Sequence, residues 1–299
     1  MNLSAQVAGK RPSGTSTKRE DPNLHLYNQR EVAAYYAALE YLSPCEKKLF
    51  DEFVKPGDAV LDVGVGGGRT TPHLSRIASR YVGIDYAPEM VAACRQKFPQ
   101  LEFVVADATN LAMLPDTTFD SVVMAFNGMD YLVSNESRRQ CLEEIHRVLK
   151  KDGRLIFSSH NPRAIFFRPS WNRGKIEELV NRLAGTWKWL REPARVVLLG
   201  LRVAAALVRC GMESVARCFR RIPRPAFWSG DGYMVDPAHG GLLTHYAIPE
   251  RVRAELEEQR FRFVQFTGDD YPRQSRAYVT DWYYYVFQKA DRSMSSPCA

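Results

Sequence analysis

The stretch 59-Ala-Val-Leu-Asp-Val-Gly-Val-Gly-Gly-Gly-68 decides the fold of this 299-residue chain. An apolar, largely β-branched run passes directly into a glycine-rich loop, and Thr70 then offers an N-cap for a helix that continues to about residue 80. This pattern predicts a strand buried on both faces, a loop and a helix. Because glycine has no Cβ, such a loop can adopt positive φ angles and let a ligand lie against its backbone. A nucleotide-like ligand at the carboxyl end of a first strand is therefore expected.

Asp62, two residues before the first glycine of the loop, indicates the charge of that ligand. A carboxylate would repel a pyrophosphate, because like charges in a cleft are poorly screened. This argues against a pyridine-nucleotide oxidoreductase, although its Gly-x-Gly-x-x-Gly loop overlaps the pattern. A ligand with a sulfonium and an ammonium group suits the acid better. At this point the chain resembles the class I S-adenosylmethionine (SAM) methyltransferases, whose motif Asp/Glu-x-Gly-x-Gly-x-Gly is matched by Asp62, Gly64, Gly66 and Gly68.

Two further acids follow in the order and spacing of that family. The predicted strand 81–85 ends in Asp85, 21 residues after Gly64, where an acid can accept both hydroxyls of a ribose. Its alternative role is that of a turn acid before a helix that begins at Pro88. The segment 101–111 predicts a third strand that ends in Asp107, which the resemblance places with Ala108 at the edge of the adenine.

The resemblance also implies where the rest of the cofactor lies. The predicted strand 119–126 opens into a segment that passes the methionine part of SAM, and the helix 31–42 covers SAM in many members of the family. The remaining residues assigned to the cofactor on this basis are Tyr36, Tyr86, Asn127, Gly128 and Met129.

The predicted architecture is an α/β fold with a seven-stranded, mostly parallel sheet whose last strand is antiparallel, and with helices on both faces. We expect a disordered arm at 1–22, a SAM-binding core at 23–162, a basic helical insertion after the fifth strand at 163–247, the end of the core at 248–290 and a tail at 291–299. Hydrophobic residues make up 45% of the chain, enough for a sizeable core. The six cysteines show no metal-ligand spacing, so we expect no metal site and a cytoplasmic location.

Positive charge is concentrated in the insertion. Residues 163–225 hold 14 Lys and Arg against four Glu, a net charge of +10, whereas the whole chain carries +7. Segment 194–221 has a helical pattern with arginines at 195, 202 and 209 along one stripe. It is expected to form a lid on the core, to lie on anionic lipid as a peripheral membrane contact, or to bind an acidic substrate or partner chain. Its charges exclude a membrane span.

Nucleic acid is a less favoured partner than anionic lipid, an acidic substrate or an acidic partner chain. The sequence is compatible with a homodimer. Members of the family that methylate bases usually carry Asn-Pro-Pro-aromatic after the fourth strand, whereas this chain has Asn127-Gly128-Met129-Asp130. We therefore expect a small-molecule substrate.

Methyl transfer to a hydroxyl or amine is helped by a base that removes a proton from the acceptor. His160, at the end of the fifth strand, and His245, before the last helix, are the candidates, although each could be a hydrogen-bonded loop histidine. Weaker candidates for orienting an acceptor are Asp130, Tyr131, Asn161 and Tyr246.

The sequence thus predicts a SAM-dependent methyltransferase that acts on an oxygen, with nitrogen as the second choice, of a small or medium-sized metabolite. A sugar-bearing, phosphorylated or lipid-linked acceptor would fit the basic insertion. The alternative is a catalytically silent SAM-binding subunit that docks on a membrane or a partner through the insertion.

Overall fold

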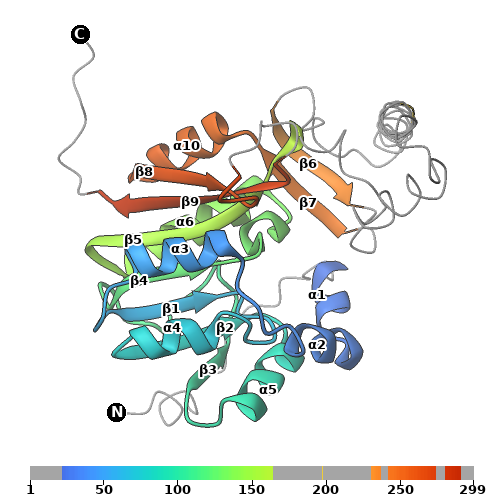
Figure 1. The fold of residues 1–299 in the computed structure, drawn as a ribbon, viewed down its shortest axis with the longest axis vertical. Helices are drawn as coiled ribbons and strands as arrows, with labels where there is room; N and C mark the ends of the chain where they lie inside the picture. Colours follow the sequence, from blue (N-terminus) through green and yellow to red (C-terminus); the bar gives the residue numbers. More distant parts are fainter. Residues whose placement is uncertain (1–21, 164–196, 198–229, 237–241, 274–279, 291–299) are drawn as a thin grey trace, which may run out of the picture.

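The computed structural model describes residues 22–163, 197, 230–236, 242–273 and 280–290. A seven-stranded sheet in the order β3-β2-β1-β4-β5-β9-β8 forms its centre (Figure 1). Strands β1 (Ala59–Val63), β2 (Arg80–Asp85), β3 (Glu102–Val105), β4 (Phe119–Met124) and β5 (Leu149–His160) run parallel. Strand β9 (Trp282–Lys289) pairs antiparallel with β5 and with β8 (Phe261–Gly268). The predicted mostly parallel sheet with an antiparallel last strand is confirmed.

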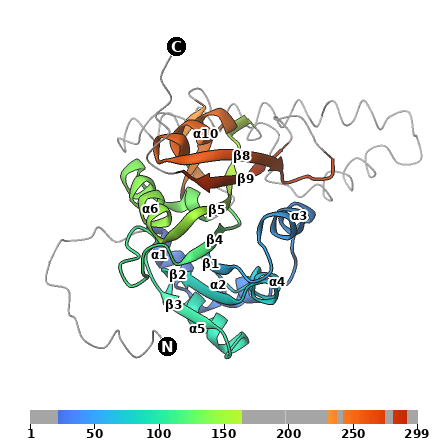
Figure 2. The same cartoon turned by 90° about the vertical axis from the view of Figure 1, so that its left-hand side faces the viewer.

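Helices cover both faces of the sheet, as the alternation of strands and helices predicted (Figure 2). One core cluster joins the sheet to α3 (Pro44–Phe53), α4 (Thr71–Ile77) and α5 (Pro88–Lys97). The other cluster joins it to α6 (Asn135–Val148) and α10 (Pro249–Glu258). Strand β1 lies between both layers, with four of its five residues buried, because its apolar side chains face helices on either side.

Two local predictions differ from the structure. Thr70 is the residue before α4, but its hydroxyl makes no cap and instead donates to Asp62 at 2.6 Å. The charged segment Lys150–Gly153, which closes with a glycine, predicts the end of a helix, but it belongs to β5, where the register with β4 shifts between Phe119 and Ser121. Gly153 fits there because a Cβ would lie 2.9 Å from the carbonyl oxygen of Lys150.

The end of the insertion is a hairpin that the sequence analysis did not anticipate. Strands β6 (Asp231–Asp236) and β7 (Leu242–Ala247) form a separate antiparallel sheet in which Tyr233 faces His245. The segment 194–221, apart from Val197, lies outside the described residues. Within the part of the chain that the structure describes, no helix is long and apolar enough to cross a membrane.

Three short elements lie at the carboxyl ends of the parallel strands: α1 (Pro22–Tyr27), α2 (Arg30–Ala37) and the 3-10 turn η2 (Gly128–Tyr131) (Figure 1). The buried side chain of Asn23 connects them to the hairpin. Its Nδ2 donates to the carbonyl oxygen of Tyr131 at 3.0 Å and to that of Leu243 at 3.5 Å. Helix α1 is therefore attached to η2 and β7 at once.

Candidate cofactor and acceptor site

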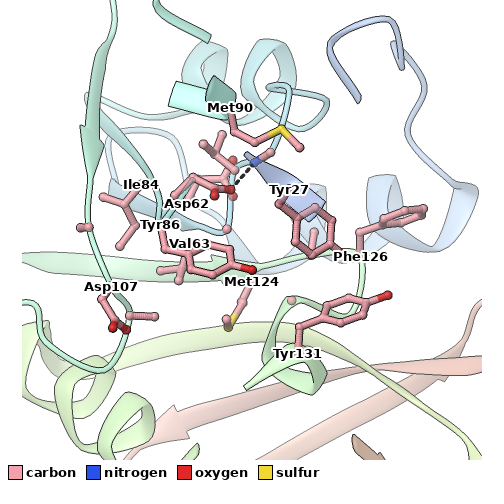
Figure 3. Close-up of a pocket in the computed structure, with 18 of the residues that line it drawn as sticks. Tyr27, Asp62, Val63, Ile84, Tyr86, Met90, Asp107, Met124, Phe126 and Tyr131 are labelled. Carbon is pink, nitrogen blue, oxygen red and sulfur yellow. Dashed lines mark hydrogen bonds between the residues drawn. The ribbon is translucent and has the colours of Figure 1, made fainter. Parts of the chain in front are cut away.

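A pocket opens at the carboxyl ends of β1, β2 and β4, as expected for a ligand site of an open α/β sheet. Figure 3 shows Asp107 on one side of this pocket and the rings of Tyr27, Phe126 and Tyr131 on the other. The structure brings most of the predicted cofactor residues into its lining: Tyr36, Asp62, Gly64, Gly66, Asp85, Tyr86, Asp107, Ala108 and Gly128. Gly68, Asn127 and Met129 lie outside the lining, as do His160 and His245.

Asp62 reaches the pocket as a buried carboxylate at the end of β1. Its Oδ2 accepts hydrogen bonds from the hydroxyls of Thr70 at 2.6 Å and Tyr81 at 2.8 Å. Burial nevertheless raises the pKa of Asp62 to about 6, because desolvation disfavours the charge more than these donors favour it. Both hydrogen bonds go to one oxygen, so Oδ1 is left for a ligand.

Asp85 holds the glycine loop in place. Its Oδ2 accepts from the backbone N–H of Gly66 and its Oδ1 from that of Ala87, each at 2.9 Å. Burial raises the pKa of Asp85 to about 6, against the opposing effect of these backbone donors. Each oxygen retains a second lone pair, so the carboxylate can still accept hydroxyl donors from the pocket.

The four glycines of the loop have two separate purposes. Gly64, Gly66 and Gly68 have φ angles of +67°, +55° and +81°, a region that side-chain-bearing residues rarely adopt. Gly67 instead allows a close approach, since a Cβ would lie 2.2 Å from the backbone nitrogen of Ala37. Helix α2 therefore lies directly against the loop. Gly68 faces the α5 side, where its Cβ would lie 2.7 Å from the ring of Phe98, which explains why it does not line the pocket.

Tyrosines form the wall beside α1 and α2. The ring of Tyr27 meets those of Tyr131, Tyr36 and Tyr86 edge-on, at centroid distances of 5.7, 6.0 and 6.4 Å. Burial and the neighbouring hydroxyl of Tyr131 raise the pKa of Tyr27 well above its usual range, so it remains a neutral phenol. Tyr27 was missed in the sequence because it lies on a six-residue helix without a marked pattern.

Arg69 is a second pocket residue that the sequence analysis missed. Its guanidinium binds the carboxylate of Glu46, with Nη1 at 2.7 Å from Oε2, and lies 4.9 Å from the ring centroid of Phe126. Nη1 also donates to the carbonyl oxygen of Tyr41 at 3.0 Å. The only available signal was an arginine directly after the glycine run.

Asp130, at the turn η2, organises a buried polar cluster beside the pocket residue Tyr131. This fully buried carboxylate accepts from the hydroxyl of Ser159 at 2.8 Å and from the backbone N–H of His160 at 2.6 Å. Nδ1 of His160 lies 2.8 Å from the same Asp130 oxygen, so the carboxylate fixes the proton on Nδ1 and leaves Nε2 as an acceptor. The side-chain amide of Asn127 lies 3.1 Å from that Nε2.

Asn127 and Met129 help build this turn from behind the pocket. Asn127 has a φ angle of +63°, its backbone N–H donates to Ser158, and its buried Oδ1 has no hydrogen-bond partner. Met129 is fully buried, and its carbonyl oxygen accepts from Arg138 Nη1 at 3.0 Å.

His245 reaches the same carboxylate from the hairpin. Its Nε2 lies 2.8 Å from Asp231 Oδ1, and its Nδ1 lies 3.9 Å from Asp130 Oδ1. The structure therefore brings the two predicted histidines to opposite sides of Asp130. Neither of them lines the pocket itself, but the ring of His160 lies 6.2 Å from that of Tyr131, which does.

Comparison with known proteins agrees with this geometry. Residues 61–157 match a family model described as a methyltransferase domain. The chain is 26% identical over 170 residues to demethylmenaquinone methyltransferase of Tropheryma whipplei (strain Twist), covering 54% of this chain and 70% of that protein. It is 33% identical over 140 residues to phosphatidylethanolamine N-methyltransferase of Cereibacter sphaeroides, covering 44% and 63%. The chain thus spans about two thirds of the length of these relatives.

Among solved structures, the CcbJ methyltransferase of Streptomyces caelestis has the same fold. The TM-score is 0.55 at 15% identity, over 89% of this chain and 98% of that one. The chain therefore has the class I fold of S-adenosylmethionine-dependent methyltransferases around a methyltransferase domain at residues 61–157, and S-adenosylmethionine is its cofactor.

Proposed function

We propose that this enzyme transfers the methyl group of SAM to an oxygen, with nitrogen as the second choice, of a small or medium-sized metabolite. The pairing of His160 with the buried Asp130, beside the pocket residue Tyr131, carries the proposal. A hydroxyl is a weak nucleophile until it loses its proton, so an acceptor of this kind gains most from a positioned base. In this assignment the acceptor hydroxyl replaces the amide of Asn127 as the partner of His160 Nε2.

We match the pocket residues to the chemical groups of SAM in the order in which these residues lie along the pocket. We assign the adenine edge to Asp107 and Ala108 and the ribose hydroxyls to Asp85, with Tyr86 beside them. Asp62 would meet the ammonium group, because a buried carboxylate favours a positive partner. Arg69 would meet the carboxylate of the methionine part, since a guanidinium can present a further N–H edge to a second carboxylate.

We assign the remaining predicted positions to the surroundings of the sulfonium and of the methionine part of SAM. We assign Gly64, Gly66 and Gly128 to backbone contact with the methionine part of SAM and Tyr36 to the wall beside the methyl group. Neutral tyrosine rings present a negative face to a cation, which favours the sulfonium without attacking it. Gly68, Asn127 and Met129 would act by shaping the loop and the turn rather than by contact.

A lipid-linked, phosphorylated or sugar-bearing acceptor is the class that we favour. The net charge of +10 in residues 163–225 supports it, because such a segment attracts anionic groups. A relative named for phosphatidylethanolamine supports a lipid acceptor independently. We propose that residues 163–247 form the cap over the acceptor, with 194–221 as a peripheral membrane contact of a cytoplasmic enzyme.

The test is a turnover assay in which purified protein and methyl-labelled SAM are incubated with fractionated cell extract. We expect label in a product, and alkaline stability of that product separates an ether from an ester. His160→Gln should retain SAM affinity in calorimetry and lose at least about 100-fold in rate, the lower end of the range for a general base. No product in any fraction would favour a silent SAM-binding subunit. Product formed at full rate by His160→Gln would contradict the assigned base.

A further inference from the structure

We propose that the β6–β7 hairpin provides an outlet for the proton that methyl transfer releases, with His245 relaying it from the Asp130–His160 pair to Asp231. The inference rests on the proposed function, in which the acceptor gives its proton to His160. It assigns the hairpin a role in turnover that is separate from binding SAM or the acceptor.

The side chains form a line from the interior to the surface. Asp130 Oδ2 lies 2.8 Å from His160 Nδ1, and Asp130 Oδ1 lies 3.9 Å from His245 Nδ1. His245 Nε2 lies 2.8 Å from Asp231 Oδ1. The exposed fractions of the side chains are 1% for His160, 0% for Asp130 and 4% for His245, but 47% for Asp231. The line therefore ends where water is available to take up a proton.

The state of His245 distinguishes a relay from a structural histidine. Because Asp231 accepts as a carboxylate, Nε2 of His245 carries the proton. Nδ1 is then a lone pair, and it is buried without a hydrogen-bond partner. Buried nitrogens are normally satisfied, and this one faces a carboxylate that would offer it a hydrogen bond only when protonated. An approach of about 1 Å would turn the 3.9 Å separation into a hydrogen bond.

The proton balance is complete without another reactant. As the bond between sulfur and the methyl carbon breaks and the bond from oxygen to that carbon forms, His160 Nε2 takes the acceptor proton. The Nδ1 proton of His160 passes to Asp130, and a half-turn of the carboxyl group brings it to His245 Nδ1. His245 then releases its Nε2 proton to Asp231 and so to water, and each imidazole must return its remaining proton to the starting ring nitrogen before the next turnover. The cofactor leaves as a neutral thioether.

The surrounding charges give the transfer a direction. Arg138 of α6 has Nη1 3.5 Å from Asp130 Oδ1 and is itself bound to Glu255 of α10 at 2.7 Å. The positive charge of this guanidinium lies beside the Asp130 oxygen that faces His245, so it repels a proton on that oxygen towards the hairpin. His245 donates to Asp231 and thereby lowers the pKa of that carboxyl group.

Two tyrosine rings pack against the two histidines. Tyr233 of β6 lies 5.0 Å from the His245 ring, and Tyr246 of β7 lies 5.0 Å from the His160 ring. Burial raises the pKa of Tyr233 above its usual range, so it stays neutral and does not compete for the proton.

The experiment compares His245→Gln and Asp231→Asn with Tyr233→Phe, which removes a hairpin hydroxyl that has no hydrogen-bond partner. Rates are measured at saturating SAM, with the extract fraction that accepts label from the wild-type protein. We expect both relay variants to lose about 100-fold or more of the rate at neutral pH, the lower end of what a lost proton-transfer group costs. Added imidazole should restore much of that rate, because a free base can enter in place of the side chain. Tyr233→Phe should remain near the wild-type rate and show no response to imidazole.

The possible results distinguish the proposed relay through His245 and Asp231 from the proposed general base His160. Full activity of both relay variants, with His160→Gln inactive, would overturn the relay and leave the proposed function intact. A loss that imidazole does not restore, accompanied by weaker SAM binding, would show a structural role instead. If His245→Gln fails to fold, Asp231→Asn at the surface still decides the question.

A spectrum of the protein labelled with ¹⁵N-histidine gives a check that needs no acceptor. The relay requires His245 as the Nε2–H tautomer and His160 as the Nδ1–H tautomer. A spectrum in which His245 carries its proton on Nδ1 contradicts the proposal.

Discussion

The guanidinium of Arg69 and the carboxylate of Glu46 form a buried ion pair, with side-chain exposed fractions of 8% and 1%, between the glycine loop and helix α3. The hydroxyl of Tyr284, on β9, donates to Oε1 of the same carboxylate at 2.7 Å. One ion pair thus connects the end of the sheet, a covering helix and the cofactor loop. It also holds Arg69 where we assign the carboxylate of SAM.

The Arg69–Glu46 pair allows stability and binding to be tested separately. Arg69→Met alone should destabilise the fold by about 3–5 kcal/mol, because Glu46 is left buried and unpaired. Adding Glu46→Leu should recover part of this loss, because it removes the unpaired charge but leaves the Tyr284 hydroxyl and the Ser43 N–H without their acceptor. SAM affinity should remain low in both variants if Arg69 contacts the methionine carboxylate. Thermal unfolding and calorimetry measure the two effects, and wild-type affinity in the double variant would contradict the assigned contact.

Gly67→Ala should weaken SAM binding by at least about 10-fold, because the steric strain of the new side chain is of the order of 1 kcal/mol or more. The new Cβ would lie 2.2 Å from the backbone nitrogen of Ala37, so α2 must move away from the loop and take Tyr36 with it. Gly57→Ala is the control: it also introduces strain at a positive φ of 93°, but nothing lies within 4 Å and the position is outside the pocket lining. It should lower stability by about 1 kcal/mol and leave SAM affinity unchanged. Equal affinities of the two variants would contradict the contact between α2 and the loop.

SAM affinity should fall as the pH drops through about 6. Burial raises the pKa values of Asp62 and Asp85 to about 6 in the free protein. An ammonium group and ribose hydroxyls both favour the ionised carboxylates, so protons compete with SAM at low pH. At pH 5 we expect about 10-fold weaker binding for each carboxylate that must ionise, with the affinity levelling off near pH 7, below the pKa of about 8 at which an α-amino group loses its charge.

Calorimetry in buffers of different ionisation enthalpy should show proton release on SAM binding at pH 5.5 to 6. Asp85→Asn should flatten the profile and also weaken binding at neutral pH. The effect on folding has the opposite sign: a raised carboxyl pKa stabilises the folded state below about pH 4, and this contribution is lost as the pH rises through about 6. An affinity that stays constant from pH 5 to 8 would rule out the assigned roles of both acids.

Two adjacent arginines of α6 should differ widely in their effect on stability. Arg138 is 1% exposed and binds Glu255 through two nitrogens, at 2.9 and 2.7 Å, beside Asp130. Arg138→Leu should cost about 3–5 kcal/mol, because it leaves buried charge unpaired. Arg139 is exposed and pairs with Glu136 and Glu143 on the same helix, so Arg139→Ala should change stability by less than about 1 kcal/mol. Chemical denaturation measures both, and similar losses would contradict the buried network.

Local sequence patterns were sufficient for the sheet and for the cofactor side of the site. Buried strands are continuous apolar runs, and Asp62, Asp85 and Asp107 each follow such a run directly, so their common position at one sheet edge could be predicted. The purpose of Gly67 could not, because it depends on where α2 lies, and nothing in the loop specifies that contact.

The acceptor side depends on contacts between distant segments. Asp130, His160 and His245 come from η2, β5 and β7, and their meeting requires a register that no local pattern contains. The hairpin itself was missed because its strands, Asp-Gly-Tyr-Met-Val-Asp and Leu-Leu-Thr-His-Tyr-Ala, lack a clean alternation of polar and apolar residues. Charge near a helix terminus is common, so Lys150 and Lys151 predict a helix end. They lie in β5, whose pairing with β4 begins at Leu149 and whose antiparallel pairing with β9 covers Arg154–His160.

The attachment of Asn23 to Tyr131 and Leu243 has a kinetic consequence. Helix α1, which carries the pocket residue Tyr27, shares one amide with the β6–β7 hairpin, so a movement of either element strains a hydrogen bond to the other. We therefore expect release of the cofactor and release of the methylated product to be kinetically coupled.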